Sequence, residues 1–346
     1  MSLIQPYDAL LLISFGGPER AEEVMPFLEH VLRGRDVPRE RMLEVAGNYY
    51  RLGGKSPIND QNRGLLAALW AELNVRGPNL PLYWGNRNWH PFLADTLREM
   101  RENGVRRAMA FVTSAFSSYS GCRQYREDIA RARAQVGEGA PEVHKLRVFY
   151  NHPLFIETMV ERADEALSRF PEGRRQEAHV VFTAHSIPLS LSNTSRYLEQ
   201  LHEACRLVSE GIGRSGHTLV FQSRSGPPGQ PWLEPDIRDH LRCLAASEGS
   251  RDVVVVPIGF ISCHMEVMFD LDTQAKALAD ELGLRMERAH TAGVHPKFIA
   301  MIRDLILERM EQRLERPAMG RFPAAPDLCP EDCCPGPARH RPNPSA

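Results

Sequence analysis

The chain has 346 residues, more than a single hydrophobic core usually accommodates, so two domains are expected. Its 42 basic and 44 acidic side chains give a net charge of −2, which argues against a protein that binds nucleic acid by neutralising phosphates. The longest apolar stretches, such as residues 253–261, are too short to span a bilayer, and the first residues lack the features of a signal peptide. We expect a cytoplasmic protein without a membrane span; contact with a membrane surface and the oligomeric state stay open.

Short apolar runs alternate with amphipathic segments along the body of the chain. The runs predict strands at residues 9–14, 82–85, 107–113, 146–150, 178–183, 218–222, 252–258 and 285–288. The amphipathic segments predict helices at residues 20–32, 62–74, 91–103, 124–136, 153–170, 197–214, 235–248, 265–281 and 295–316. This alternation is typical of parallel sheets covered by helices on both faces. We expect an α/β fold of two Rossmann-like lobes, 1–152 and 153–316, each a four-stranded parallel sheet flanked by helices, with the last helix a candidate for packing back on the first lobe.

The last segment, residues 317–346, differs from the rest of the chain. It holds eight prolines and few apolar residues, so no packed core is expected there. Three of the seven cysteines, Cys329, Cys333 and Cys334, lie in this tail. A structural disulfide framework is not expected in a reducing compartment. The purpose of the tail is therefore expected to lie in its cysteines.

His185 is the first candidate for chemistry. It follows the apolar run 180–184 and precedes Ser-Ile-Pro, and ligands of open parallel sheets bind beyond the carboxyl ends of the strands. A neutral imidazole at that position can accept a proton or bind a metal. The alternative is a structural histidine that caps a turn.

Glu266 is the second candidate, because it follows the buried run 253–258 and precedes a predicted helix. Helical spacing places Glu266, Asp270 and Gln274 on one face, with Asp272 beside them. Such a row suggests a path for a cation or for protons, although charge at a helix start is a simpler explanation. Histidine with carboxylate suits a divalent metal such as Fe²⁺, Co²⁺ or Zn²⁺.

Nucleotide binding is poorly supported, since the turn Gly16-Gly17-Pro18 lacks the G-x-G-x-x-G spacing and no Walker A motif occurs. The predicted loops are instead rich in aromatic residues, and several arginines accompany them. Aromatic faces with arginines at the edge suit a large flat apolar ligand that carries carboxylates at its rim. A tetrapyrrole fits this description.

Seven segments resemble those of ferrochelatases, in the same order and spacing. They are LLLISFGGPE (10–19), YYRLGGKSPIND (49–60), YWGNRNW (83–89), TSAFSSYSGCRQY (113–125), VFTAHSIP (181–188), FQSRSGPPGQPWLEPD (221–236) and VPIGFISCHMEVMFDLD (256–272). The resemblance extends from residue 7 to about residue 312 and is strongest to coproporphyrin III ferrochelatases of Gram-positive and actinobacterial type. It implies a chelatase-like fold and insertion of Fe²⁺ into a porphyrin between the two lobes. The resemblance leaves protoporphyrin IX as an alternative substrate. A cobalt chelatase and a non-catalytic porphyrin or haem carrier are the competing functions.

The resemblance also implies roles for individual residues. His185 and Glu266 match the metal-binding and catalytic pair of the family, and Asp270 would belong to a secondary metal site. Positions that contact the porphyrin match Phe15, Arg33, Tyr49, Ser56 and Tyr125. Phe15 stands where many coproporphyrin enzymes have a tyrosine that can ligate the product iron, which a phenyl ring cannot do. Cys263 and Gln274 replace acidic residues of the family, which would weaken the secondary site.

The cysteine tail resembles that of ferrochelatases carrying a [2Fe–2S] cluster. Such a cluster needs four thiolates. The tail supplies Cys329, Cys333 and Cys334, and Cys122 stands where the internal ligand of the family falls. A zinc site, or a tail without any ligand, are the alternatives.

Overall fold

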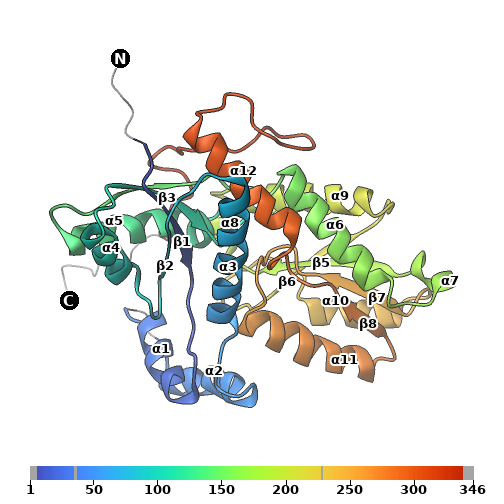
Figure 1. Cartoon of the computed structure of the whole chain (residues 1–346). Helices are drawn as coiled ribbons and strands as arrows, with labels where there is room; N and C mark the ends of the chain where they lie inside the picture. Colours follow the sequence, from blue (N-terminus) through green and yellow to red (C-terminus); the bar gives the residue numbers. More distant parts are fainter. Residues whose placement is uncertain (1–5, 35–36, 227–228, 338–346) are drawn as a thin grey trace.

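The computed structural model describes residues 6–34, 37–226 and 229–337 and shows two parallel sheets of four strands each (Figure 1). The first sheet has the order β2-β1-β3-β4 and the second the order β6-β5-β7-β8. The strands are β1 (Ala9–Ser14), β2 (Leu82–Asn86), β3 (Arg107–Val112), β4 (Glu142–Lys145), β5 (His179–His185), β6 (Thr218–Gln222), β7 (Asp252–Val256) and β8 (Arg285–Arg288). The predicted α/β fold with two four-stranded parallel sheets is therefore confirmed.

Helices connect the strands and cover the sheets. They are α1 (Val24–Val31), α2 (Arg39–Arg51), α3 (Ile58–Arg76), α4 (Leu93–Glu102), α5 (Gln124–Val136), α6 (Pro153–Leu167), α7 (Glu172–Arg175), α8 (Leu189–Ser192), α9 (Tyr197–Gly211), α10 (Ile237–Ala246), α11 (Lys276–Glu281) and α12 (Pro296–Met310). The 3₁₀-helix η1 (Ala21–Glu23) and two π-helices, η2 (Tyr119–Arg123) and η3 (Val267–Ala275), complete the set in the described residues. None of these helices is long and apolar enough to cross a membrane.

Two sequence predictions differ from the structure, and helices α2, α7 and α8 were not predicted. The strand expected at 146–150 is displaced, because β4 pairs with β3 at Glu142–Lys145 and the apolar run after it is buried without pairing as a strand. Phe149 in that run stacks on Phe111 with ring centroids 5.4 Å apart, so its apolar character reflects burial. The helix expected at 265–281 is π-helical over most of its length. Helix α2 was not predicted, because its mostly polar residues bury only Ala46.

One hydrophobic core joins the two halves of the molecule. It includes Leu12 and Phe111 of the first sheet and Phe182 and Val254 of the second. Helix α12 packs against both α3 and α6, which places it between the sheets (Figure 1). Each sheet also has a separate hydrophobic cluster on its outer face. The carboxyl ends of β1 and β5 are thereby held in one rigid frame.

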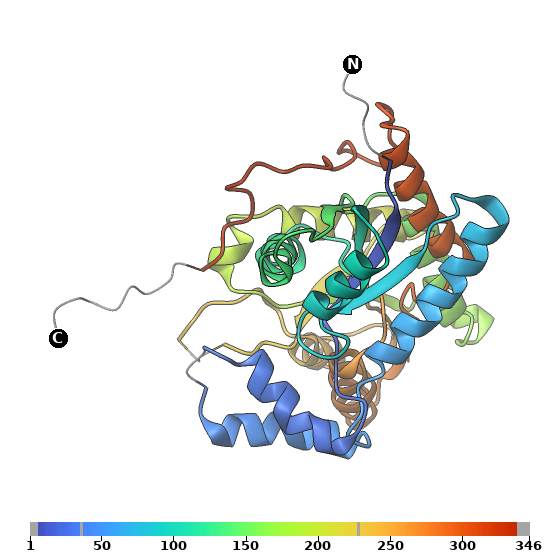
Figure 2. The same ribbon diagram turned by 60° about the vertical axis from the view of Figure 1, so that its left-hand side comes forward.

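The described part of the tail, residues 317–337, is packed against the body of the protein, although these residues form no helix or strand. It leaves α12 and runs along the first lobe past α5 (Figure 2). Asp327 pairs with Arg309 at 3.1 Å and with Arg316 at 2.7 Å, and Arg126 of α5 donates to the carbonyl oxygens of Cys329, Pro330 and Glu331. Polar contacts therefore hold the tail in place where an apolar core is lacking.

Candidate active site

His185 is the last residue of β5 and lies opposite Gln222 of β6. Its Nδ1 lies 2.5 Å from the carbonyl oxygen of Ser186, and because a carbonyl only accepts, Nδ1 carries the proton of this hydrogen bond. Nε2 is consequently the nitrogen that faces the site. The backbone is also fixed, since the Tyr197 hydroxyl donates to the His185 carbonyl oxygen at 3.0 Å.

Glu266 approaches this nitrogen from the segment before the π-helix η3. Its Oε1 lies 3.6 Å from Nε2 of His185, and its Oε2 lies 4.0 Å from Nδ1 of His264. Burial lowers the pKa of His185, but the charge and hydrogen bond of Glu266 outweigh burial and raise it to about 9. Burial raises the pKa of Glu266, and His185 outweighs this and lowers it to about 2. The two residues form an ion pair at neutral pH.

Asp270 is held apart from this ion pair by its own partners. The Ser223 hydroxyl donates to its Oδ2, and the Gln222 side-chain amide lies 3.4 Å from the same oxygen. Burial, aided by the charge of Glu266, raises its pKa to about 6. Asp272 turns away from the row and pairs with Arg288. The Gln222 side-chain amide donates both to the Asp270 carboxylate and to the backbone carbonyl oxygen of Glu266, at 3.2 Å.

Two aromatic residues of the first lobe pack against Phe27, and one of them, Tyr49, lies close to the pair. Phe15 follows β1 with 39% of its surface exposed, and its ring centroid lies 6.3 Å from that of Phe27. The ring of Tyr49 in α2 also packs against Phe27, with centroids 6.0 Å apart. Burial raises the pKa of the Tyr49 phenol, and Glu266 of the second lobe is near enough for its charge to raise this pKa further. Arg33 lies exposed after α1.

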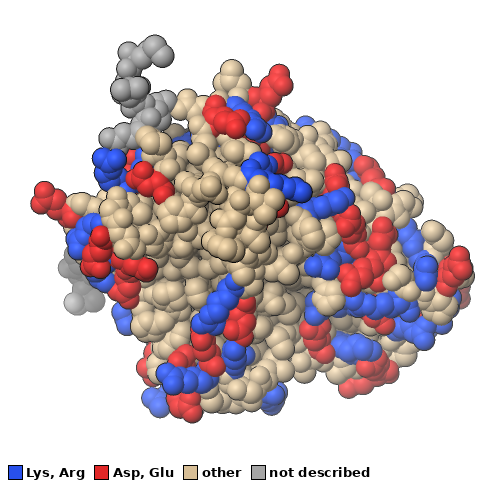
Figure 3. Space-filling view, viewed as in Figure 1, with Lys and Arg blue, Asp and Glu red and all other residues tan. Residues whose placement is uncertain are grey.

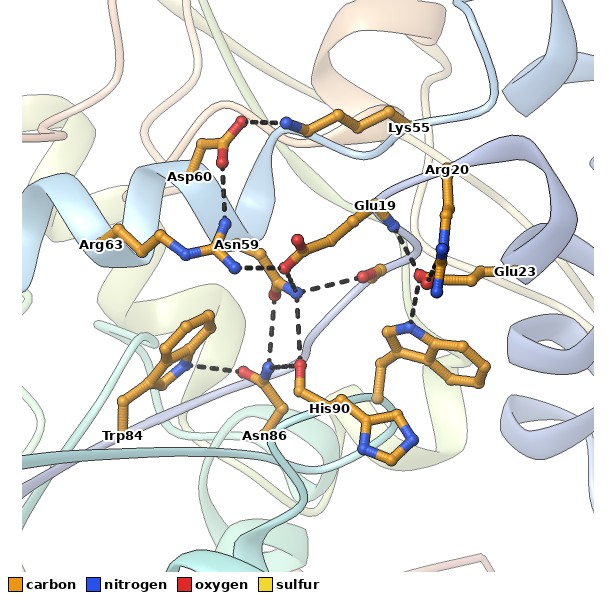
Figure 4. A network of polar contacts seen from close by, with 12 residues as sticks. Glu19, Arg20, Glu23, Lys55, Asn59, Asp60, Arg63, Trp84, Asn86 and His90 are labelled. Atoms are coloured by element: carbon orange, nitrogen blue, oxygen red, sulfur yellow. Dashed lines mark hydrogen bonds and ion pairs between the residues drawn. The ribbon is translucent and has the colours of Figure 1, made fainter.

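Ser56 is buried behind the turn of Gly16-Gly17. A Cβ at Gly17 would lie 2.7 Å from Cβ of Ser56, so this close approach requires glycine. Asn59, next along α3, is fully buried and donates to the Gly17 carbonyl, the Glu19 carboxylate and the His90 carbonyl (Figure 4). Its own side-chain oxygen accepts from Asn86, whose side-chain oxygen accepts from Trp84 (Figure 4). The network ties the loops after β1 and β2 to the start of α3.

Tyr125 occupies a different environment from the other predicted contact residues. It lies at the start of α5 with 5% of its surface exposed, within the outer core of the first lobe. The Arg87 guanidinium stands 3.7 Å above its ring and pairs with Asp128 at 2.5 Å. The ring therefore supports the Arg87–Asp128 ion pair from below.

The four predicted cluster cysteines converge in the structure. Cys122, Cys329, Cys333 and Cys334 line one cavity of about 140 Å³, together with Arg123, Arg126 and Lys145. The Cys333 and Cys334 sulfurs lie 3.6 Å apart. Burial and the neighbouring thiols raise the pKa of Cys329 to about 11 and that of Cys334 to about 12. Cys205, Cys243 and Cys263 lie elsewhere.

Across the described residues, no three His, Cys, Asp or Glu side chains are arranged to hold a single metal ion. A [2Fe–2S] cluster contains two irons, so this finding concerns single-ion sites. His264 next to Glu266 was not singled out from the sequence, although its spacing of two residues in H-M-E was the available signal. The roles of Asn59, Tyr197 and Gln222 could not be predicted, because their partners are distant in the sequence.

The chain is similar to known ferrochelatases over most of its length. The ferrochelatase family profile matches residues 7–310. The chain is 52% identical to the ferrochelatase of Rhodopirellula baltica, with 96% of this chain and 95% of the relative covered. It is 49% identical to the coproporphyrin III ferrochelatase of Streptomyces coelicolor (99% and 96%) and 51% identical to that of Mycolicibacterium smegmatis (90% and 93%). The sirohydrochlorin chelatase SirB of Bacillus subtilis subspecies spizizenii shares the fold, with a TM-score of 0.52, 13% identity and coverage of 88% and 96%. This chain belongs to the ferrochelatase family.

Proposed function

We propose that the protein inserts Fe²⁺ into coproporphyrin III, with His185 and Glu266 at the point of insertion. The observation that carries the proposal is the approach of His185 Nε2 to Glu266 Oε1, 3.6 Å apart, next to Tyr49 of the opposite lobe. Relatives at about half identity over nearly the whole chain carry the name coproporphyrin III ferrochelatase. The choice of coproporphyrin over protoporphyrin IX rests on these relatives.

The chemistry of insertion matches the groups present. A porphyrin loses two pyrrole N–H protons when a divalent metal enters, so the site needs proton acceptors and weakly held metal ligands. At neutral pH the pair offers two carboxylate oxygens for these tasks, and Nε2 of His185 can serve as a ligand or proton acceptor only after it has lost its own proton. Asp270, with a pKa near 6, can take up and release protons close to neutral pH. Asp270 is thus a second proton acceptor close enough to the pair for the charges of His185 and Glu266 to act on its pKa.

The first lobe supplies the surface for the macrocycle. Phe15 and Tyr49 both pack their rings against Phe27, and the Asn59 network holds the loop that follows β1. Arg33 is exposed and available for a propionate. Phe15 cannot ligate iron, so the protein chain offers the product no phenolate at that position. We propose Ser56 and Tyr125 as further contacts, although both are buried here.

His185→Ala is expected to abolish Fe²⁺ insertion while coproporphyrin still binds, because the porphyrin surface belongs to the first lobe. Insertion is followed by the loss of porphyrin fluorescence, and binding by quenching of protein fluorescence. His290→Ala is the matched control, because the His290 side chain is 55% exposed and distant in the sequence from the pair. Retained insertion in His185→Ala would contradict the proposed role.

The same assay separates the competing functions. The wild-type protein should insert Fe²⁺ into coproporphyrin III faster than into protoporphyrin IX. A preference for Co²⁺ would indicate a cobalt chelatase. Binding without insertion would indicate a carrier.

Positive and negative side chains are mixed over the face shown in Figure 3, in agreement with a small-molecule substrate rather than nucleic acid. We infer a cytoplasmic location.

We further propose that the tail cavity holds a [2Fe–2S] cluster on Cys122, Cys329, Cys333 and Cys334. The four thiols line one cavity, and Arg123, Arg126 and Lys145 in the same lining complement the charge of thiolates. The raised thiol pKa values mean that metal binding displaces protons from these groups. When bound, the cluster supplies one-electron redox chemistry and cross-links the tail to the first lobe.

Anaerobically purified protein should absorb at about 400–550 nm, where iron–sulfur thiolate transitions occur. Cys122→Ser should remove this absorption, because it deletes the ligand that the body of the protein supplies. Cys243→Ser should retain it, since Cys243 is exposed and lies outside the cavity. Metal analysis that finds zinc, or no metal, in the wild-type protein would contradict the cluster.

A further inference from the structure

A buried chain of contacts connects His185 with the loop that carries Cys122. It begins at the carbonyl of His185, which accepts from the Tyr197 hydroxyl at 3.0 Å. Tyr197 is the first residue of α9 and is buried, and its ring meets Phe116 of the first lobe edge to face, with centroids 6.2 Å apart. The strand end that holds His185 therefore rests on a residue packed against the other lobe.

Gln200 makes the second contact, one helical turn further along α9. Its side-chain oxygen accepts from the backbone N–H of Ser117 at 2.7 Å, and its side-chain nitrogen donates to the Ser117 hydroxyl at 3.0 Å. Only 2% of Gln200 is exposed. Because both ends of the amide are used, the orientation of Gln200 relative to Ser117 is fixed.

Ser117 connects Gln200 with the cysteine cavity. It lines the same cavity as Cys122. The next residue, Ser118, caps the π-helix η2, since its hydroxyl accepts from the Gly121 N–H at 2.9 Å. Cys122 lies in that helix. The contacts from His185 to Cys122 thus run through hydrogen bonds and two rigid helices.

We propose that Tyr197 and Gln200 are positioning residues, which tie His185 to the loop of Cys122 and set the place of its imidazole. The proposal rests on the proposed role of His185 in iron insertion. Neither residue contacts the rings of Phe15 or Tyr49, which are proposed to bind the porphyrin. Substitution of Tyr197 or Gln200 is therefore expected to slow the insertion step and to leave porphyrin binding unchanged. A displacement of about 1 Å can cost two orders of magnitude in rate, so small shifts of β5 matter.

The test uses the full-length protein with Tyr197→Phe, Gln200→Met and the double variant. Tyr197→Phe removes only the hydroxyl, and Gln200→Met keeps the length of the side chain but removes both hydrogen bonds. Glu199→Gln is the control, because Glu199 lies between them on α9, is exposed and pairs with Arg196 on the surface. Each variant is assayed for kcat and for KM of coproporphyrin III, and the ¹⁵N signals of the His185 ring are followed, assigned by their absence in His185→Ala.

Each single variant is expected to lower kcat about tenfold, to leave KM within twofold and to shift the His185 ring signals. The kcat of the double variant should lie no more than about threefold below the kcat of the more impaired single variant, because both substitutions interrupt one path. Unchanged kcat and unchanged ring signals in folded Tyr197→Phe and Gln200→Met would overturn the proposal. So would fully additive losses, or a parallel rise of KM. A wild-type protein that fails to insert iron would instead refute the proposed function.

Discussion

Glu266 and Asp270 are four residues apart, yet their surroundings drive their pKa values in opposite directions. The pKa of Glu266 falls to about 2 because His185 outweighs burial, whereas that of Asp270 rises to about 6 because burial dominates. One carboxylate is thus permanently charged at neutral pH and the other can exchange protons. Two neighbouring acids with separated pKa values are a common arrangement at sites of proton transfer.

Asp270→Asn should stabilise the protein at neutral pH. The folded-state pKa of about 6 lies above the usual 3.8, so the folded protein binds this proton more tightly than the unfolded chain, and stability falls as the pH rises from about 4 to about 6. The variant should raise the free energy of unfolding by about 1–2 kcal/mol at pH 7 and by little at pH 4. Urea denaturation at pH 4 and pH 7 measures the change in the free energy of unfolding. Asp280→Asn is the control, because the Asp280 side chain is exposed. An equal effect at both pH values would show that the charge is not responsible.

Helix α12 shows how one element joins both lobes and the tail. Glu308 on this helix is 2% exposed and pairs with Arg147, its Oε2 2.7 Å from Nε and its Oε1 2.9 Å from Nη2. Arg147 lies just after β4 and also donates to the carbonyl of Pro317 at the start of the tail. The helix begins with Pro296 at its first position, and the side chain of the preceding His295 caps it by accepting from the Lys297 N–H.

Glu308→Gln should destabilise the protein strongly, because it leaves the charge of Arg147 buried without its carboxylate. Breaking a buried pair in this way costs about 3–5 kcal/mol. Glu311→Gln changes an exposed glutamate near the end of the same helix, which pairs with Arg313, and should cost less than about 1 kcal/mol. The midpoint of urea denaturation distinguishes the two. Similar midpoints would mean that the Arg147–Glu308 pair contributes little.

At the scale of the whole molecule, the site depends on two lobes that share one core. The His185–Glu266 pair belongs to the second lobe, whereas the aromatic rings of Phe15 and Tyr49 belong to the first. The cysteine cavity also joins two parts of the chain, with Cys122 in the body and three cysteines in the tail. Contacts between the lobes, through α12 and through Gln200, hold the proposed insertion pair in place relative to the first lobe.

The sequence by itself determined the alternation of strands and helices, the family, and the candidates His185, Glu266 and Cys122, because periodicity, strand ends and local motifs are properties of short segments. Tertiary structure alone decided which of these residues meet. The run 146–150 is predicted as a strand but is buried core, and residues 267–275, predicted as part of an α-helix, form a π-helix. The contacts of Gln200 with Ser117 and of Asp327 with Arg309 join residues far apart in the chain. Such pairings depend on how the whole chain packs, which no local pattern records.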